Sequence, residues 1–128
     1  MNKTNAELFE KTYIQLEELN REMSTLSKKA PNDVINKFKL GFINTLLNTA
    51  NTLLNTRYLP FKEFRTFDED AMPTNSDVTI ILVQYLGCMD KYRTDHSCMD
   101  YITNELKWIL DDDETTANNI KNRKPRGR

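Results

Sequence analysis

Apolar residues recur every seven positions near the start of the chain, at Phe9, Leu16 and Met23. A stripe with this period over three heptads is typical of one face of an amphipathic α-helix. Most of the charged residues in this stretch fall off the stripe, as the solvent side of such a helix requires. The pattern therefore predicts a long helix over 5–29.

Pro31 ends this helix, and a second helix is predicted over 32–57, where two apolar stripes lie side by side. Together they form a wide face, which favours a place in the middle of a helical bundle. Only 3 glycines and 4 prolines occur in the 128 residues, and this scarcity also favours long helices. The two stripes consist of Ile35, Phe38, Phe42 and Leu46, and of Ile43, Leu47, Ala50 and Leu54.

The second predicted helix contains a near-perfect repeat, in which residues 44–50 (NTLLNTA) are followed by 51–57 (NTLLNTR). We interpret the paired leucines as a core face, because two units are too short to establish a coiled coil. The alternative is a homodimer through the 44–57 leucine repeat. We interpret the many asparagines and threonines as compositional bias, with a functional polar ladder as the alternative.

The connection after this helix, residues 59–76, combines three phenylalanines with an acidic cluster. Connections of this length in compact domains tend to be functional or to pack through their own side chains. Rings that close the end of the bundle are one interpretation, which we favour for Phe61. A partner-binding surface is the other, which we favour for the remaining rings with the acids around them. The candidate partner-binding residues are Phe64, Phe67, Asp68, Glu69 and Asp70.

Two further helices are predicted over 77–93 and 98–110, from apolar residues spaced three or four apart. The β-branched run at 78–83 is also compatible with a buried strand, but the longer spacing favours a helix. The sequence therefore predicts an all-α protein. Its single domain over 1–114 is expected to be a compact bundle of about four helices, with the aromatic and acidic connection before the third.

The end of the chain is polar and then basic, which predicts a disordered tail over 115–128. The last ten residues carry five positive charges and no acid, so removing them from the net charge of −1 leaves −6 on residues 1–118. An acidic body argues against a general nucleic-acid-binding domain, whereas the tail is a candidate for contacts with phosphates or with an acidic partner. The candidate tail residues are Lys121, Arg123, Lys124, Arg126 and Arg128.

No motif in the sequence specifies a reaction. The three glycines stand far apart and form no phosphate-binding loop, and no serine lies in a Gly-x-Ser-x-Gly elbow. Cys88, His96 and Cys98 fall within eleven residues, but the close ligand pairs of a zinc site are missing. The acids at 68–70 lack the pattern of a calcium-binding EF-hand loop. We therefore expect no enzymatic activity, no bound metal and no cofactor.

The sequence shows no signal for a membrane or for secretion. No stretch approaches the roughly 18 apolar residues of a membrane span, and charged residues at 7, 10 and 11 interrupt any signal peptide. Two cysteines cannot build a disulfide framework. We therefore expect a soluble, cytoplasmic protein without membrane contacts.

In size and composition the chain resembles small regulators encoded by phages or plasmids. That resemblance implies a protein that binds a larger host machine such as RNA polymerase. Together with the missing catalytic motifs, it predicts a non-catalytic protein–protein interaction module, a small regulator or adaptor that docks onto a larger protein. The alternative is a nucleic-acid-associated protein whose basic tail contacts phosphates.

Overall fold

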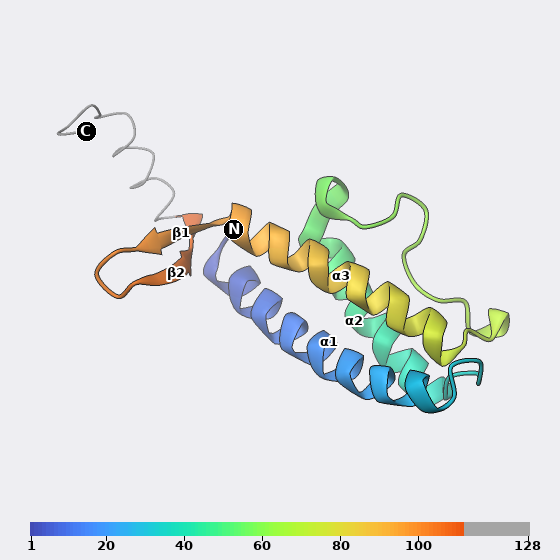
Figure 1. The fold of residues 1–128 in the computed structure, drawn as a ribbon. Coiled ribbons are helices and arrows are strands. Elements are labelled where there is room, and N and C mark those ends of the chain that lie inside the picture. The colour runs from blue at the N-terminus through green and yellow to red at the C-terminus, as the bar shows by residue number, and fades with distance from the viewer. Residues whose placement is uncertain (112–128) are drawn as a thin grey trace.

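A computed structural model describes residues 1–111 of the chain. Three long helices dominate it (Figure 1): α1 spans Lys3–Lys29, α2 spans Lys37–Tyr58 and α3 spans Asn75–Asp95. The helix α1 runs antiparallel to the other two. The connection after α2 returns along the bundle before α3 begins, so α2 and α3 run in the same direction.

The three helix predictions over 5–29, 32–57 and 77–93 are confirmed with shifted ends. The Asn2 side chain accepts a hydrogen bond from the Asn5 backbone N–H at 2.7 Å, so α1 begins two residues earlier than predicted. The α2 helix begins five residues later than predicted, with Asn36 as its N-cap. The Thr74 side chain caps α3 in a reciprocal pair with Asp77. The 78–83 run, for which a strand was the alternative, is helical.

The predicted fourth helix over 98–110 is wrong, because this segment forms a β-hairpin. Strand β1 spans Ser97–Asp100 and pairs antiparallel with β2, Glu105–Trp108. The Asp100 side chain accepts hydrogen bonds from two backbone N–H groups of the turn, and Asn104 adopts the left-handed conformation with φ of 59°. These turn interactions favour the hairpin, so the protein is mostly helical but not all-α.

The core lies between the three helices and uses the predicted apolar faces only in part. The α1 stripe is fully buried, as predicted, and the repeat leucines Leu47 and Leu54 are buried within the same molecule. The leucine repeat therefore supplies a core face. The largest fully buried side chains are Phe9, Leu16 and Met23 of α1, Leu40, Ile43, Leu47 and Leu54 of α2, and Leu82, Tyr85 and Met89 of α3.

The two leading asparagines of the repeat hold the connection between α2 and α3. The Asn44 side chain exchanges two hydrogen bonds with the backbone of Phe67, each 2.9 Å long. One repeat unit further, Asn51 donates to the Arg65 carbonyl at 2.8 Å and accepts from the Tyr85 hydroxyl at 2.6 Å. Positions seven apart lie on the same side of a helix. These two asparagines thus form a polar ladder whose role is structural, and the functional ladder that the sequence left open stays a prediction.

The hairpin is attached to the bundle at its base. Trp108 packs edge-to-face on the buried Phe9 ring, with ring centroids 4.9 Å apart. The backbone N–H of Ile109 donates to the His96 carbonyl at 2.8 Å, and that of Asp111 donates to the Met1 carbonyl at 3.0 Å. An isolated two-stranded hairpin is only marginally stable in water, so these contacts hold it in place.

Candidate protein-binding groove

The most exposed large apolar side chains of α2 are Phe38 and Phe42. Phe38 is 75% exposed and Phe42 is 55% exposed, and their rings meet edge-to-face with centroids 5.5 Å apart. The sequence placed both in a core stripe, and this expectation is wrong. The segment predicted as a fourth helix is instead the hairpin, which lies at the opposite end of the bundle from the start of α2 (Figure 1). No other described element covers this side of α2.

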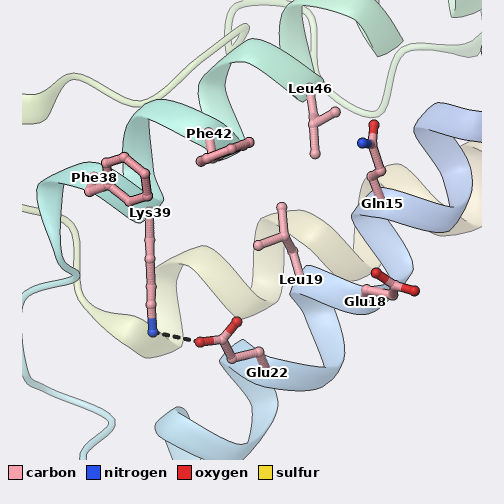
Figure 2. Close-up of a pocket in the computed structure, with 8 residues that line it drawn as sticks. All are labelled: Gln15, Glu18, Leu19, Glu22, Phe38, Lys39, Phe42 and Leu46. Atoms are coloured by element: carbon pink, nitrogen blue, oxygen red, sulfur yellow. Dashed lines mark hydrogen bonds and ion pairs between the residues drawn. The ribbon is translucent and has the colours of Figure 1, made fainter.

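A hollow of about 350 Å³ lies beside the two rings, between α1 and α2. Figure 2 shows Phe42 and Leu46 extending from α2 toward α1, with Leu19 of α1 pointing back at them. We call this the Phe42 hollow. Its full lining consists of Gln15, Glu18, Leu19, Glu22, Phe38, Lys39, Phe42 and Leu46.

The charges at the Phe42 hollow are unequal. Lys39 donates to Glu22 Oε1 at 2.6 Å across the hollow, so these two charges offset each other (Figure 2). Glu18 is exposed and makes no ion pair or hydrogen bond with any described residue. The α1 side of the rim therefore carries one unbalanced negative charge, at Glu18, whereas the exposed Lys37 lines a neighbouring hollow at the same two rings that includes no residue of α1.

A second hollow, of about 320 Å³, lies further along the same seam between α1 and α2. We call it the Leu8 hollow, and we call the whole seam with both hollows the α1–α2 groove. Leu8 and Leu19 stand eleven residues apart on one side of α1, so the two hollows are about 16 Å apart along the helix axis. The Leu8 hollow is lined by Met1, Asn5, Leu8, Thr49, Thr52, Leu53 and Tyr92, none of which is a charged side chain.

The phenylalanines proposed as partner-binding residues pack onto the core. Phe61, Phe64 and Phe67 are all half-buried and form a chain of edge-to-face rings. Phe64 also approaches the buried Tyr85, with centroids 6.5 Å apart. Phe64 and Phe67 thus pack against the core beside α3, and the interpretation that the rings close the end of the bundle stays a prediction. The role of Phe64 and Phe67 in binding a partner stays a prediction.

The acidic part of that connection is exposed and lies apart from the Phe42 hollow. Asp68 accepts from the Asp70 backbone N–H at 2.9 Å and so caps the short 3₁₀ helix η1, Glu69–Ala71. Asn44, which holds this connection, projects from the side of α2 opposite to Phe42, because the two positions differ by 200° around the helix. Glu69 and Asp70 instead line a smaller hollow with Lys37 and Leu40 at the start of α2, so the predicted surface shares no lining residue with the α1–α2 groove but approaches it beside Phe38.

Other expected features can be placed only in part. Cys88 is half-buried, and this burial raises the pKa of its thiol, whereas Cys98 is exposed on β1. Among residues 1–111, no group of three or more His, Cys, Asp or Glu side chains is placed to hold a metal ion.

No helix in this part of the chain is long and apolar enough to cross a membrane. The predicted tail and its five basic residues lie outside the described residues.

A second exposed apolar feature is the tip of the hairpin. Tyr101 and Ile102 are almost fully exposed there. They stand on a turn that projects from the bundle, and neither lines any of the hollows described above. The α1–α2 groove, which combines apolar side chains with two concave sites, is the better candidate for binding.

The groove was missed because periodicity identifies an apolar face but not what covers it. The signal that could have found it is the width of the α2 face. Two stripes need neighbours on two sides, and residues 1–111 contain too few helices to supply them.

Comparisons of the chain with family models, with curated proteins and with solved structures found no match.

Proposed function

We propose that this protein is a non-catalytic protein–protein interaction module, a small cytoplasmic regulator or adaptor that docks onto a larger protein through the α1–α2 groove. The observation that supports this most directly is the exposed pair Phe38 and Phe42 beside the Phe42 hollow. Aromatic side chains next to a concave apolar site are the usual anatomy of a binding hot spot.

The energetics favour covering these rings. Burying a phenylalanine that is otherwise exposed contributes about 1.5–3 kcal/mol. Both rings stand on a helix whose opposite side is packed in the core, so their positions are set before a partner arrives. A preorganised site loses less conformational entropy on binding. The pair is therefore suited to contribute a large part of a binding free energy.

The resemblance in size and composition suggests the kind of partner. Small regulators of this type act on larger host machines, and RNA polymerase is the candidate that we propose to test first. A binding surface on the helical body also distinguishes this proposal from the nucleic-acid alternative, which would use the basic tail.

Paired substitutions on two faces test the proposal. The variant Phe38→Ser/Phe42→Ser removes both rings from the groove, and Ile80→Ser makes a similar change at an apolar residue of α3 that is 60% exposed. Because all three positions are exposed, we expect each variant to melt within a few degrees of the unchanged protein. We expect the groove variant to lose capture of purified RNA polymerase and of host-lysate proteins, and Ile80→Ser to retain both. Equal capture by the two folded variants would contradict the proposal.

A further inference from the structure

We infer that the α1–α2 groove takes a single amphipathic α-helix of the partner protein, with apolar anchors eleven residues apart and a cationic side chain facing Glu18. This inference rests on the proposed function, because it names the occupant of the same groove. It follows from the shape of the groove, from the spacing of its hollows and from its charge.

The shape of the groove fits a helix. It is the seam between two antiparallel helices, and the residues that line its ends on α1 run from Asn5 to Glu22. These eighteen residues of helix correspond to about 27 Å. A third helix laid on the seam of two others completes the packing of a helical bundle. The occupant would therefore act as an additional helix of the bundle.

The spacing of the hollows sets the spacing of the anchors. Leu8 and Leu19 mark the two hollows and are eleven residues apart on α1. Eleven residues make three turns and a further 20°, so side chains at i and i+11 of a bound helix point the same way. A residue at i+4 shares that face as well. The larger apolar surface, around Phe42, suits the i and i+4 pair, and the Leu8 hollow suits the single side chain at i+11.

The charge of the groove selects the polar side of the occupant. Glu18 is the unbalanced charge at the Phe42 hollow, because Glu22 is already paired with Lys39. The polar side chains at the edge of the Leu8 hollow are neutral, among them Asn5 and Thr52, and the N-terminal ammonium of Met1 there is paired with Asp111 at 2.9 Å. A lysine or arginine beside the i and i+4 anchors therefore meets an opposite charge. Such rim pairs contribute more to specificity and to association rate than to affinity.

A second copy of this chain fits the groove less well. If two copies met through this groove, the hollows of one copy would face the hollows of the other and stay unfilled. A single helix instead presents protruding side chains that fill both hollows. Most of the leucines that the sequence offered for a homodimer are also buried in their own core, at Leu47, Leu53 and Leu54. Leu46 lines the Phe42 hollow, and the buried Leu53 lines the floor of the Leu8 hollow.

Three synthetic peptides test the inference on the full chain. Each is an 18-residue helix based on Ala and Gln with a fluorescent label. The first has leucines at i, i+4 and i+11 and lysines flanking the leucine pair; the second has glutamates in place of the lysines; the third has alanines in place of the leucines. Binding is measured by fluorescence anisotropy at low salt. We expect the alanine peptide to bind at least about tenfold more weakly than the first, the loss typical of removing a hot spot.

The preference of the groove for a cationic peptide is tested with its own control. We expect the glutamate peptide to bind about two- to fivefold more weakly than the lysine peptide, the range of an exposed ion pair. Glu18→Gln should remove this difference while leaving the fold unchanged. Phe38→Ser/Phe42→Ser should abolish binding of the lysine peptide, and Ile80→Ser should not affect it.

Several outcomes would overturn the inference. Equal binding of the lysine and glutamate peptides, or of the leucine and alanine peptides, contradicts the proposed occupant. If no peptide binds while partner capture still depends on Phe42, the docking function stands and the helical occupant is wrong. If the protein sediments as a dimer that Phe42→Ser dissociates, the occupant is a second copy. If neither peptide binding nor partner capture responds to the phenylalanine substitutions, the groove has no docking role.

Discussion

Trp108 donates its indole N–H to Oε2 of Glu10 at 2.7 Å, across 98 positions of the chain. The same carboxylate accepts two hydrogen bonds from the Arg93 guanidinium, at 2.8 and 3.0 Å. One half-buried side chain of α1 therefore holds both the end of α3 and the second strand of the hairpin. Charge-assisted and bidentate contacts of this kind are among the stronger hydrogen bonds in proteins.

Removing this carboxylate should loosen the hairpin. We expect Glu10→Ala to lower the free energy of unfolding by about 1–3 kcal/mol, because it leaves Trp108 without its acceptor and Arg93 with only its longer contact to Asp90, at 3.4 Å. Since Trp108 is the single tryptophan of the chain, its fluorescence reports on the hairpin directly. Urea denaturation followed by this fluorescence measures both effects. Glu7→Ala, at an exposed position of the same helix, is the control and should behave like the unchanged protein.

The asparagine ladder predicts a difference between two asparagines of one repeat unit. Asn44→Ala removes both hydrogen bonds to the Phe67 backbone and should cost about 1–3 kcal/mol, because that backbone is left without partners. Asn48→Ala removes an exposed amide and should cost less than about 0.5 kcal/mol. Amide hydrogen exchange at Phe67 should accelerate only in the first variant. Unchanged exchange in Asn44→Ala would mean that the ladder does not hold the connection.

Adjacent leucines of the repeat separate the core from the groove. Leu47 is fully buried, so Leu47→Ala should cost about 2–5 kcal/mol. Leu46 is half-buried at the Phe42 hollow, so Leu46→Ala should cost clearly less, about 1 kcal/mol. Chemical denaturation of the two variants measures the difference. Equal losses would show that Leu46 belongs to the core and that the groove is closed in solution.

Alkaline pH should destabilise the fold through Tyr85. Burial raises the pKa of its hydroxyl above the usual value of about 10. Above pH 10 the unfolded state loses this proton while the folded state keeps it, so the free energy of unfolding is level below pH 10 and falls as the pH rises toward the folded pKa. Between pH 8 and 11, the free energy of unfolding measured by denaturation should fall less steeply for Tyr85→Phe than for the unchanged protein. Tyr101→Phe, at the exposed hairpin tip, should leave the fall unchanged.

The sequence was most informative where one pattern had one explanation. The heptad of Phe9, Leu16 and Met23 predicted α1 and its buried side, because a long regular period fits no other element. A helix was predicted over the hairpin because Met99, Ile102 and Leu106 are also spaced three and four residues apart. Two interactions favour the hairpin over a helix. The Asp100 side chain accepts hydrogen bonds from the turn, and Trp108 of β2 packs on Phe9 of α1, which is distant in the sequence.

The same limit explains the groove. The pattern around Phe38 and Phe42 correctly marks an apolar face of α2, but no local pattern states whether a face is covered by its own chain or by another. That depends on how many helices the chain finally supplies. Because residues 98–108 form a hairpin at the far end of the bundle, they do not cover these two rings.

Hydrogen–deuterium exchange of the protein alone and bound to the partner that it captures tests the central claim most directly. Residues 15–22 and 38–46 form the Phe42 hollow, whereas residues 80–87 lie on α3 and serve as the internal control. We predict slower exchange on binding in the first two segments and no change in the third. Protection confined to α3 or to the hairpin, with the Phe42 hollow unaffected, would contradict the claim that the α1–α2 groove is the docking surface.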